Sequence, residues 1–215
     1  MIGQFFRNGK LYTQERIHVN DHDFRSAADG IAVPHGLYDV TRNIGYLTLG
    51  TSHDTAEFAC ACIQRWWVTY GRLDYPDAPE ILLLCDCGGS NNARHYLFKQ
   101  ELQTLADALG MAIRIAHYPP YTSKYNPIEH RLFPHVTRAC QGVVFKTIEI
   151  AQAFMAKTST KRGLTVFTSI LDQVFATKRK VADNFKHTMT IAFDALLPQW
   201  NYVAFPHLSQ VSGFI

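Results

Sequence analysis

Apolar positions along the chain form short β-prone runs that alternate with longer stretches of helical period. Residues 36–40 and 46–50 are two β-prone runs, and the segment 41–45 between them contains the turn residues Asn43 and Gly45. Such an arrangement predicts a β-hairpin. Residues 1–30 are polar and rich in turn residues, so we expect loops there, with one short strand at 4–6.

A helix is predicted to begin at Asp54, because Asp54 and Glu57 have the spacing of a capping box. Aromatic and apolar residues then recur at helical spacing, at Phe58, Cys62, Trp66 and Tyr70. We interpret the adjacent Trp66 and Trp67 as core residues. Proline residues at 76 and 79 place the following loop.

Residues 80–86 contain a continuous apolar run, 81–85, that ends at Asp86. Such a run predicts a buried strand in the middle of a sheet that is covered on both faces. A second helix follows, with apolar residues from Phe98 to Leu109 and Gly110 as its stop signal. The next strand spans 112–116, and this strand–helix–strand order predicts parallel pairing with a right-handed crossover.

A third helix is predicted from Pro127 to about Cys140, with Ile128, Leu132 and Val136 on one face. Three further elements are predicted after it: a helix at 147–156, a strand at 164–171 and a helix at 183–196. The pattern as a whole is that of an α/β fold.

The length of 215 residues and the 47% hydrophobic content indicate one globular domain with a small extension. The net charge of only +3 does not suggest a purely electrostatic nucleic-acid binder. Basic residues nevertheless gather between Lys157 and Lys186. This segment either lies against a phosphate backbone or is an ordinary solvated surface.

The five cysteines do not form the even, regularly spaced set of a secreted disulfide framework. Buried free thiols are the preferred interpretation. A metal-binding module made of Cys85, Cys87, His95 and His117 is an alternative with poor spacing. No signal peptide or membrane-spanning apolar run is visible, so we expect a reduced, cytoplasmic setting without a membrane partner.

Asp86 and Glu129 are the candidate catalytic residues. Asp86 ends a predicted strand, and Glu129 lies in the first turn of a predicted helix after a proline-rich loop. Carboxylates at element ends suit Mg²⁺, which prefers oxygen ligands and supports phosphoryl transfer. Both residues also have a structural interpretation: Asp86 as the cap of the Gly88-Gly89 turn, and Glu129 in a capping box behind Asn126.

Several separate segments carry a resemblance to a known family. They are 34–39 (PHGLYD), 52–58 (SHDTAEF), 65–67 (RWW), 86–91 (DCGGSN), 117–133 (HYPPYTSKYNPIEHRLF) and 160–164 (TKRGL). Their order and content resemble those of insertion-sequence transposases with an Asp-Asp-Glu (DDE) catalytic core, more narrowly of the ISAzo13 type. The resemblance runs from near Gly3 to about Tyr202, which is almost the whole chain.

The resemblance implies a ribonuclease-H-like core with a mixed five-stranded sheet. It implies that Asp86 is the second and Glu129 the third catalytic carboxylate, both ligands of Mg²⁺ or Mn²⁺. Members of this family cut DNA at transposon ends and join the 3′-hydroxyl to target DNA, so DNA is the implied partner in the bacterial cytoplasm, at the nucleoid. A homodimer is left open. Five basic residues are DNA-contacting candidates, with a solvated face as the alternative: Lys124, His130, Arg131, Lys161 and Arg162.

Two features depart from the family pattern. The family's first catalytic Asp precedes a Gly-x-Phe segment, which is Gly3–Phe5 here, so the first strand and its Asp are expected to be missing. That strand lies between the hairpin and the 80–86 strand in this fold, and its loss leaves backbone groups unpaired on both sides. Asp39 and Asp54 are the nearest substitutes in sequence order. The second departure is Cys87, where the family tends to have glycine.

We therefore expect residues 1–142 to form a partial catalytic core and residues 143–215 to form a C-terminal extension of the same domain. Two functions remain open at this point. The chain is either a DDE transposase core or an inactive remnant of one that binds DNA without sequence specificity.

Overall fold

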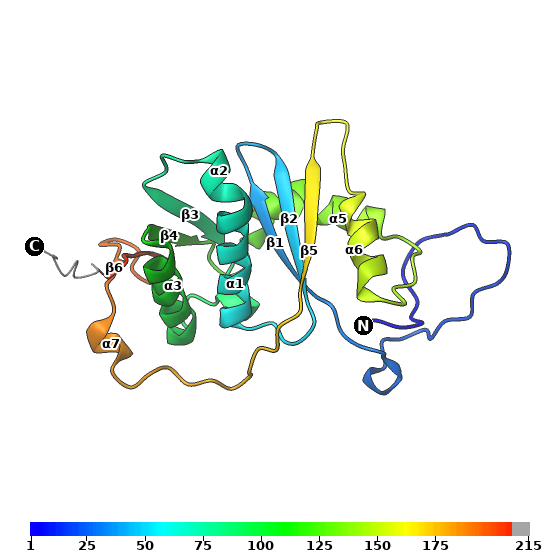
Figure 1. The fold of residues 1–215 in the computed structure, drawn as a ribbon, viewed down its shortest axis with the longest axis horizontal. Coiled ribbons are helices and arrows are strands. Elements are labelled where there is room, and N and C mark those ends of the chain that lie inside the picture. Colours follow the sequence, from blue (N-terminus) through cyan, green and yellow to red (C-terminus); the bar gives the residue numbers. More distant parts are fainter. Residues whose placement is uncertain (208–215) are drawn as a thin grey trace, which may run out of the picture. The chain divides into compact units, whose positions relative to one another are not determined.

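The computed structural model describes residues 1–207, which fall into two compact units that alternate along the sequence (Figure 1). The first unit consists of Met1–Asp54 and Lys124–Ala176, and the second, within the described residues, of Thr55–Ser123 and 177–207. Each unit contains one sheet with both parallel and antiparallel pairs, so the predicted α/β class is confirmed. The boundary at residue 142 falls within the second segment of the first unit and stays a prediction.

The first unit has a three-stranded sheet in the order β1-β2-β5. Its regular elements are β1 (Val33–Asp39), β2 (Ile44–Gly50), α4 (Pro127–Arg131), α5 (Phe133–Ala139), α6 (Ile148–Ala156) and β5 (Thr165–Leu171). Strands β1 and β2 form the predicted antiparallel hairpin, and β5 pairs with β2 in parallel. Asn43 turns the hairpin with a φ of 57°, a conformation that asparagine tolerates better than most residues.

The predicted helix from Pro127 to about Cys140 is interrupted, and this expectation was wrong in part. Helix α4 ends at Arg131, Leu132 leaves helical geometry with φ −123° and ψ −65°, and α5 begins at Phe133. The reason is Pro134, which has no amide hydrogen and whose ring would clash with the carbonyl four residues earlier in a continuous helix. The two short helices therefore meet at an angle set by Leu132.

Leu132 is the centre of the core of the first unit. Its side chain is fully buried and clusters with Leu47 of β2, with Val166 of β5, and with Leu164, which directly precedes β5. The half-buried side chains that pack against this cluster include Ile128 and Val136, which confirms the predicted apolar face of this segment. The cluster holds the helix that carries Glu129 against the sheet.

Residues 1–32 have little regular structure, as predicted. The expected strand at 4–6 is reduced to an isolated bridge between Phe5 and Asn20, and Ile2 bridges Gly30. One short 3₁₀ helix spans Arg25–Ala27. Phe5 is fully buried, so this segment still contributes to a core.

The second unit has a four-stranded sheet in the order β3-β4-β7-β6. Its regular elements are α1 (Ala56–Trp66), a π-helical turn (Trp67–Gly71), α2 (Arg72–Asp74), β3 (Glu80–Cys85), a 3₁₀ turn (Gly89–Asn91), α3 (Tyr96–Leu109), β4 (Ala112–His117), α7 (Phe185–Thr188), β6 (Ile191–Phe193) and β7 (Asn201–Ala204). Strands β3 and β4 are parallel, as predicted, whereas β7 is antiparallel to both of its neighbours.

Helix α1 begins one residue later than predicted. Thr55, not Asp54, is the N-cap, because its hydroxyl accepts a hydrogen bond of 3.1 Å from the amide of Phe58. A threonine hydroxyl satisfies the same free amide that an Asp carboxylate would, so the capping signal was correct and its position was not. The helix buries Phe58 and Cys62, and Trp67 is buried while Trp66 is half-buried.

The expectation of a buried central β3 was wrong. Leu82 and Leu84 are 56% and 41% exposed, whereas Ile81 on the opposite face is buried. Strand β3 lies at the edge of its sheet and pairs only with β4 among the described strands. One face of this strand is therefore open to solvent, although its sequence is apolar on both faces.

Helix α3 is confirmed, with Phe98, Leu102 and Leu105 buried and Gly110 as its C-cap at φ 62°. Glycine adopts this left-handed conformation without steric cost. The predicted helix at 183–196 was wrong, since only Phe185–Thr188 is helical and β6 follows.

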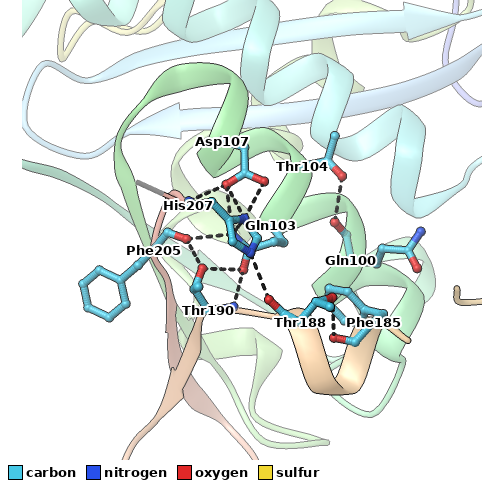
Figure 2. A network of polar contacts seen from close by, with 9 residues as sticks. All are labelled: Gln100, Gln103, Thr104, Asp107, Phe185, Thr188, Thr190, Phe205 and His207. Carbon is cyan, nitrogen blue, oxygen red and sulfur yellow. Dashed lines mark hydrogen bonds and ion pairs between the residues drawn. The ribbon is translucent and has the colours of Figure 1, made fainter. Parts of the chain in front are cut away.

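The reason for this difference is a polar network around Gln103 of α3 (Figure 2). Thr190 donates from its amide and hydroxyl to the Gln103 side-chain oxygen, at 3.0 Å each. Gln103 in turn donates to the carbonyl of Phe205 at 2.7 Å. These bonds hold residues 190 and 205 in extended form, so tertiary contacts override the local preference for helix.

Within residues 1–207 the strands form two separate sheets, and the single five-stranded sheet that the resemblance implies is not formed. Strands β1 and β3 are each the last strand on one side of their sheet. None of the five cysteines is in a disulfide, and Cys60 and Cys62 are buried as expected. Among the described helices, none has the length and apolar character needed to span a bilayer.

Candidate metal and nucleic-acid site

Asp86 is the first residue after β3, in the second unit. Its side chain is partly exposed, and one carboxylate oxygen accepts a weak hydrogen bond of 3.3 Å from the amide of Gly88. Gly89 follows at φ 55° and starts a 3₁₀ turn. The capping role considered for Asp86 is therefore present, and it uses a single long bond, which leaves most of the carboxylate's acceptor capacity for other ligands.

The backbone of Asp86 is held by a buried histidine. His117, the last residue of β4, is 5% exposed, and its Nδ1 lies 3.0 Å from the Asp86 carbonyl oxygen. Its Nε2 lies 3.0 Å from the hydroxyl of Tyr202 on β7. Burial lowers the pKa of His117 and raises the pKa of Tyr202. No sequence pattern indicates this role for Tyr202, whereas His117 is the first residue of the 117–133 signature.

Glu129 lies in the first turn of α4, in the first unit. Asn126 is buried and is the N-cap, accepting a 3.4 Å hydrogen bond from the amide of Ile128, and Pro127 is the first helical residue. The cap at Asn126 and the position of Pro127 were both predicted from the sequence. In a capping box the Glu side chain also bonds back to the N-cap amide. No such bond is formed: within residues 1–207 the partly exposed Glu129 carboxylate accepts no hydrogen bond and joins no ion pair.

The two candidate carboxylates belong to different compact units. That they share one metal site stays a prediction. Within the part of the chain described here, no three His, Cys, Asp or Glu side chains come together as a metal-binding group. The donors Asp86 and Glu129 are nonetheless of the kind that Mg²⁺ takes, since each is a carboxylate accessible from solvent.

Of the two proposed substitutes for the first Asp, Asp39 has a structural role and Asp54 lies near a histidine. One Asp39 carboxylate oxygen accepts from the amides of Thr41 and Arg42, at 2.9 Å each, and so closes the hairpin turn. Asp54 faces His35, whose pKa burial lowers to about 4 while the Asp54 charge partly opposes that shift. That either residue completes a catalytic site stays a prediction.

Three of the five DNA-contacting candidates surround Glu129 in sequence. Lys124, His130 and Arg131 are all exposed. The Lys124 ammonium lies 5.1 Å from the ring centre of Tyr125, and the His130 ring donates to the Lys124 carbonyl. Lys124 and Arg131 therefore carry positive charge on either side of Glu129 along the chain, in the first unit.

The remaining two candidates, Lys161 and Arg162, are exposed in the turn before β5. Asn43 of the hairpin turn donates to the Arg162 carbonyl at 3.1 Å, and the amide of Thr165 donates to the Asn43 carbonyl at 3.4 Å. The turn that contains Arg42 therefore lies beside the turn that contains Lys161 and Arg162. This juxtaposition concentrates three basic residues at one end of the β1-β2-β5 sheet.

The basic segment from Lys157 to Lys186 is divided between the two units, with Lys157, Lys161 and Arg162 in the first. Arg179 is also engaged inside the second unit. Its guanidinium lies 2.6 Å from Glu57 and 3.0 Å from Glu101. Arg179 is thus neutralised by acidic neighbours, while Lys161 and Arg162 are the better candidates for phosphate contact.

The Cys/His metal module is not formed. Both ring nitrogens of His117 are used in hydrogen bonds to protein groups, so neither is available to a metal ion. Burial raises the pKa of the Cys85 thiol to about 12, and a thiol must lose its proton to become a strong ligand. The described cysteines and histidines do not assemble into a group of three or more.

Comparison with known proteins identifies the family to which this chain belongs. A family model described as the Rhodopirellula transposase DDE domain matches residues 1–206. No curated protein and no solved structure matches the chain. Because the model covers nearly all of the sequence, including Asp86, Glu129 and the five basic candidates, the chain belongs to the ISAzo13-type family of transposase DDE domains.

Proposed function

We propose that this chain is the DDE core of a transposase that cuts transposon-end DNA and joins it to target DNA, with Asp86 and Glu129 as two of its three catalytic carboxylates. Mg²⁺ or Mn²⁺ is the proposed cofactor. When bound, the metal activates the attacking oxygen and stabilises the leaving one. The chain's own carboxylates hold the metal, and its basic turns hold the DNA backbone.

The observation that carries the proposal is the uncommitted carboxylate of Glu129. Asn126 caps α4 by itself, and Glu129 has no protein partner among the described residues although its position in the helix would allow one. Such a group is suited to an external cation.

The DNA-binding part of the proposal rests on the turns at one end of the first unit's sheet. Lys161 and Arg162 are exposed there, and Asn43 ties their turn to that of Arg42. Phosphate contacts from such residues position a duplex without reading its sequence. Lys124, His130 and Arg131 would add contacts near Glu129. We extend the proposal to a homodimer bound to DNA. Measuring the mass of the protein–DNA complex in solution tests this.

The remaining carboxylate, which is the first of the family pattern, is proposed to come from an additional strand. Strands β1 and β3 each end their sheet, and the backbone groups on their outer edges have no strand partner among residues 1–207. An open edge of this kind accepts a further strand. Asp86 follows β3 directly, so a carboxylate on a strand added to β3 would reach the neighbourhood of Asp86.

The proposal is tested with labelled transposon-end duplex and Mg²⁺ or Mn²⁺, using this chain and a version extended upstream by the first strand of the family. In the active version, Asp86→Asn and Glu129→Gln should each lower the cleavage rate at least about a hundredfold, as loss of several kcal/mol of metal stabilisation predicts. Asp77→Asn and Glu149→Gln are matched controls on exposed carboxylates and should be near wild type. Unchanged cleavage in the Asp86 and Glu129 variants would refute the proposal.

An inactive remnant is the second candidate function, and one observation favours it: the described residues bring no three acidic or metal-binding side chains together. This alternative predicts no cleavage by either version, together with weak DNA binding that falls steeply with salt. Cleavage only by the extended version would indicate that this chain requires the added strand. Cleavage by both would direct attention to Asp39 and Asp54.

A further inference from the structure

The bond between His117 and Asp86 is placed where the β-ladder stops. Cys85 and His117 are the last paired residues of β3 and β4, and the Tyr118 amide donates to the Cys85 carbonyl at 2.7 Å. The next carbonyl, that of Asp86, is bonded instead to the His117 side chain, at 3.0 Å. A side chain thus holds the backbone at the residue where regular pairing ends.

The proton arrangement follows from the partners. A carbonyl oxygen only accepts, so Nδ1 of His117 must donate to Asp86. In the neutral ring Nε2 is then an acceptor, and the Tyr202 hydroxyl donates to it. Only the Nδ1–H tautomer satisfies both bonds.

The same tyrosine is connected to the far side of the loop that follows Asp86. Lys99 of α3 is 5% exposed, donates to the Ala93 carbonyl, and lies 4.7 Å from the ring centre of Tyr202. Tyr202 therefore touches one residue that holds Asp86 and another that holds Ala93. Three buried polar side chains from β4, α3 and β7 anchor both ends of the 86–93 loop.

We propose that His117, oriented by Tyr202, is a positioning residue that fixes the Asp86 backbone and so directs the Asp86 carboxylate toward its metal ion. This inference rests on the proposed function, since it takes Asp86 as a metal ligand. Residues in hydrogen-bond contact with metal ligands orient them, and their loss lowers metal affinity about 10- to 100-fold. A purely structural His117 would affect stability without this selectivity.

A matched pair of variants distinguishes the roles of the two ring nitrogens of His117. In His117→Asn the side-chain amide nitrogen takes the place of Nδ1 and can still donate to the Asp86 carbonyl. In His117→Gln the amide reaches the place of Nε2, and the donor to Asp86 is lost. Both variants disturb the same buried position, so similar losses of thermal stability are expected for the two.

The first measurement is Mn²⁺ binding by the purified chain, followed as free Mn²⁺ by electron paramagnetic resonance. We expect His117→Gln to weaken binding about tenfold or more and His117→Asn to weaken it less than about threefold. Equal weakening by the two variants would overturn the inference while leaving the proposed function intact. Wild-type affinity in Asp86→Asn would overturn the proposed function, and the inference with it.

The second measurement is independent of metal and activity. Nitrogen NMR of histidine side chains should show His117 as the Nδ1–H tautomer, with Nε2 unprotonated. Tyr202→Phe removes the hydroxyl at nearly constant shape and should shift His117 toward a mixture of tautomers. A His117 ring protonated at Nε2 in the wild type would overturn the inference regardless of the Mn²⁺ result.

Discussion

Gly45 of β2 lies against the segment that positions Glu129, and substituting it with alanine tests that packing. A methyl group added to its Cα would lie 2.4 Å from one terminal carbon of Leu132 and 3.1 Å from the other. Val166 is 3.2 Å away on the same side. Since Leu132 is fully buried in the core cluster, it has little room to retreat.

The expected loss of stability in Gly45→Ala is the difference between two opposing contributions to the free energy of unfolding. Overpacking of a filled core costs about 1–3 kcal/mol, and alanine offsets about 0.4–1 kcal/mol by restricting the unfolded chain. We therefore expect Gly45→Ala to destabilise the first unit by about 0.5–2 kcal/mol. Gly30→Ala is the control, because its added methyl group would have no neighbour closer than 4.0 Å and should be neutral or slightly stabilising.

The assay must report on the first unit specifically. All three tryptophans, at 66, 67 and 200, belong to the second unit, so tryptophan fluorescence does not follow the first. Hydrogen exchange of peptides from β2 and β5, read by mass spectrometry over a denaturant series, follows it directly. Exchange in β3 and β4 provides an internal reference for the second unit.

A double-mutant cycle tests the assignment to Leu132. Leu132→Ala alone should cost about 2–5 kcal/mol, because it leaves a cavity. With Gly45→Ala the new methyl group occupies part of that cavity, so the combined cost should be at least about 1 kcal/mol below the sum. Additivity within about 0.5 kcal/mol would refute the reasoning, as it would mean that the two side chains do not meet.

Three further predictions follow from individual contacts. Asn126→Ala should destabilise the first unit by about 1 kcal/mol through loss of the α4 cap, whereas Asn126→Asp should be nearly neutral, and the same exchange assay measures both. Hydrogen bonding to the Thr188 carbonyl and to Asp107 raises the pKa of His207. The stability that protonated His207 contributes is therefore complete below about pH 6.5 and is lost as the pH rises through the raised pKa. Amide hydrogen exchange of β7, corrected for its intrinsic pH dependence, should become faster above neutral pH, and His207→Gln should remove this pH dependence. Lysine at both Leu82 and Leu84 should reduce concentration-dependent self-association in sedimentation experiments with no loss of thermal stability, because both side chains are exposed on an edge strand.

The hairpin, α3 and α6 were predictable because each has a local signal. An Asn turn separates β1 from β2, Gly110 ends α3, and the Thr147 side chain caps α6 by accepting from the Ile150 amide. These signals involve residues within a few positions of each other. They therefore act before any tertiary contact forms, and the fold does not override them.

The break between α4 and α5 also has a local signal in the sequence. Pro134 is incompatible with the interior of a continuous helix, whereas the apolar spacing of Ile128, Leu132 and Val136 favours one unbroken helix. That spacing was informative about burial, since all three contribute to one core. Periodicity therefore identified the buried face correctly and the continuity of the helix incorrectly.

Two other errors arose from contacts that no local pattern contains. An apolar run such as 81–85 is equally compatible with a central strand and with an edge strand that has one open face. Residues 189–193 are extended because Thr190 bonds to Gln103, which is 87 positions away. In each case the deciding partner is distant in sequence, so the sequence alone could not supply the answer.

The candidate site shows the same division between what is local and what is not. Sequence reasoning found both carboxylates and the cap of α4, because each lies within a short signature. It did not find Tyr202, which contacts His117 from 85 positions away in the sequence.

If Asp86 is a metal ligand, then its orientation depends on β7, which lies outside all of the sequence signatures. A C-terminal truncation that removes β7 should then impair Mn²⁺ binding even though every signature residue is retained. Normal Mn²⁺ affinity in a folded chain ending before Asn201 would show that the signatures alone are sufficient.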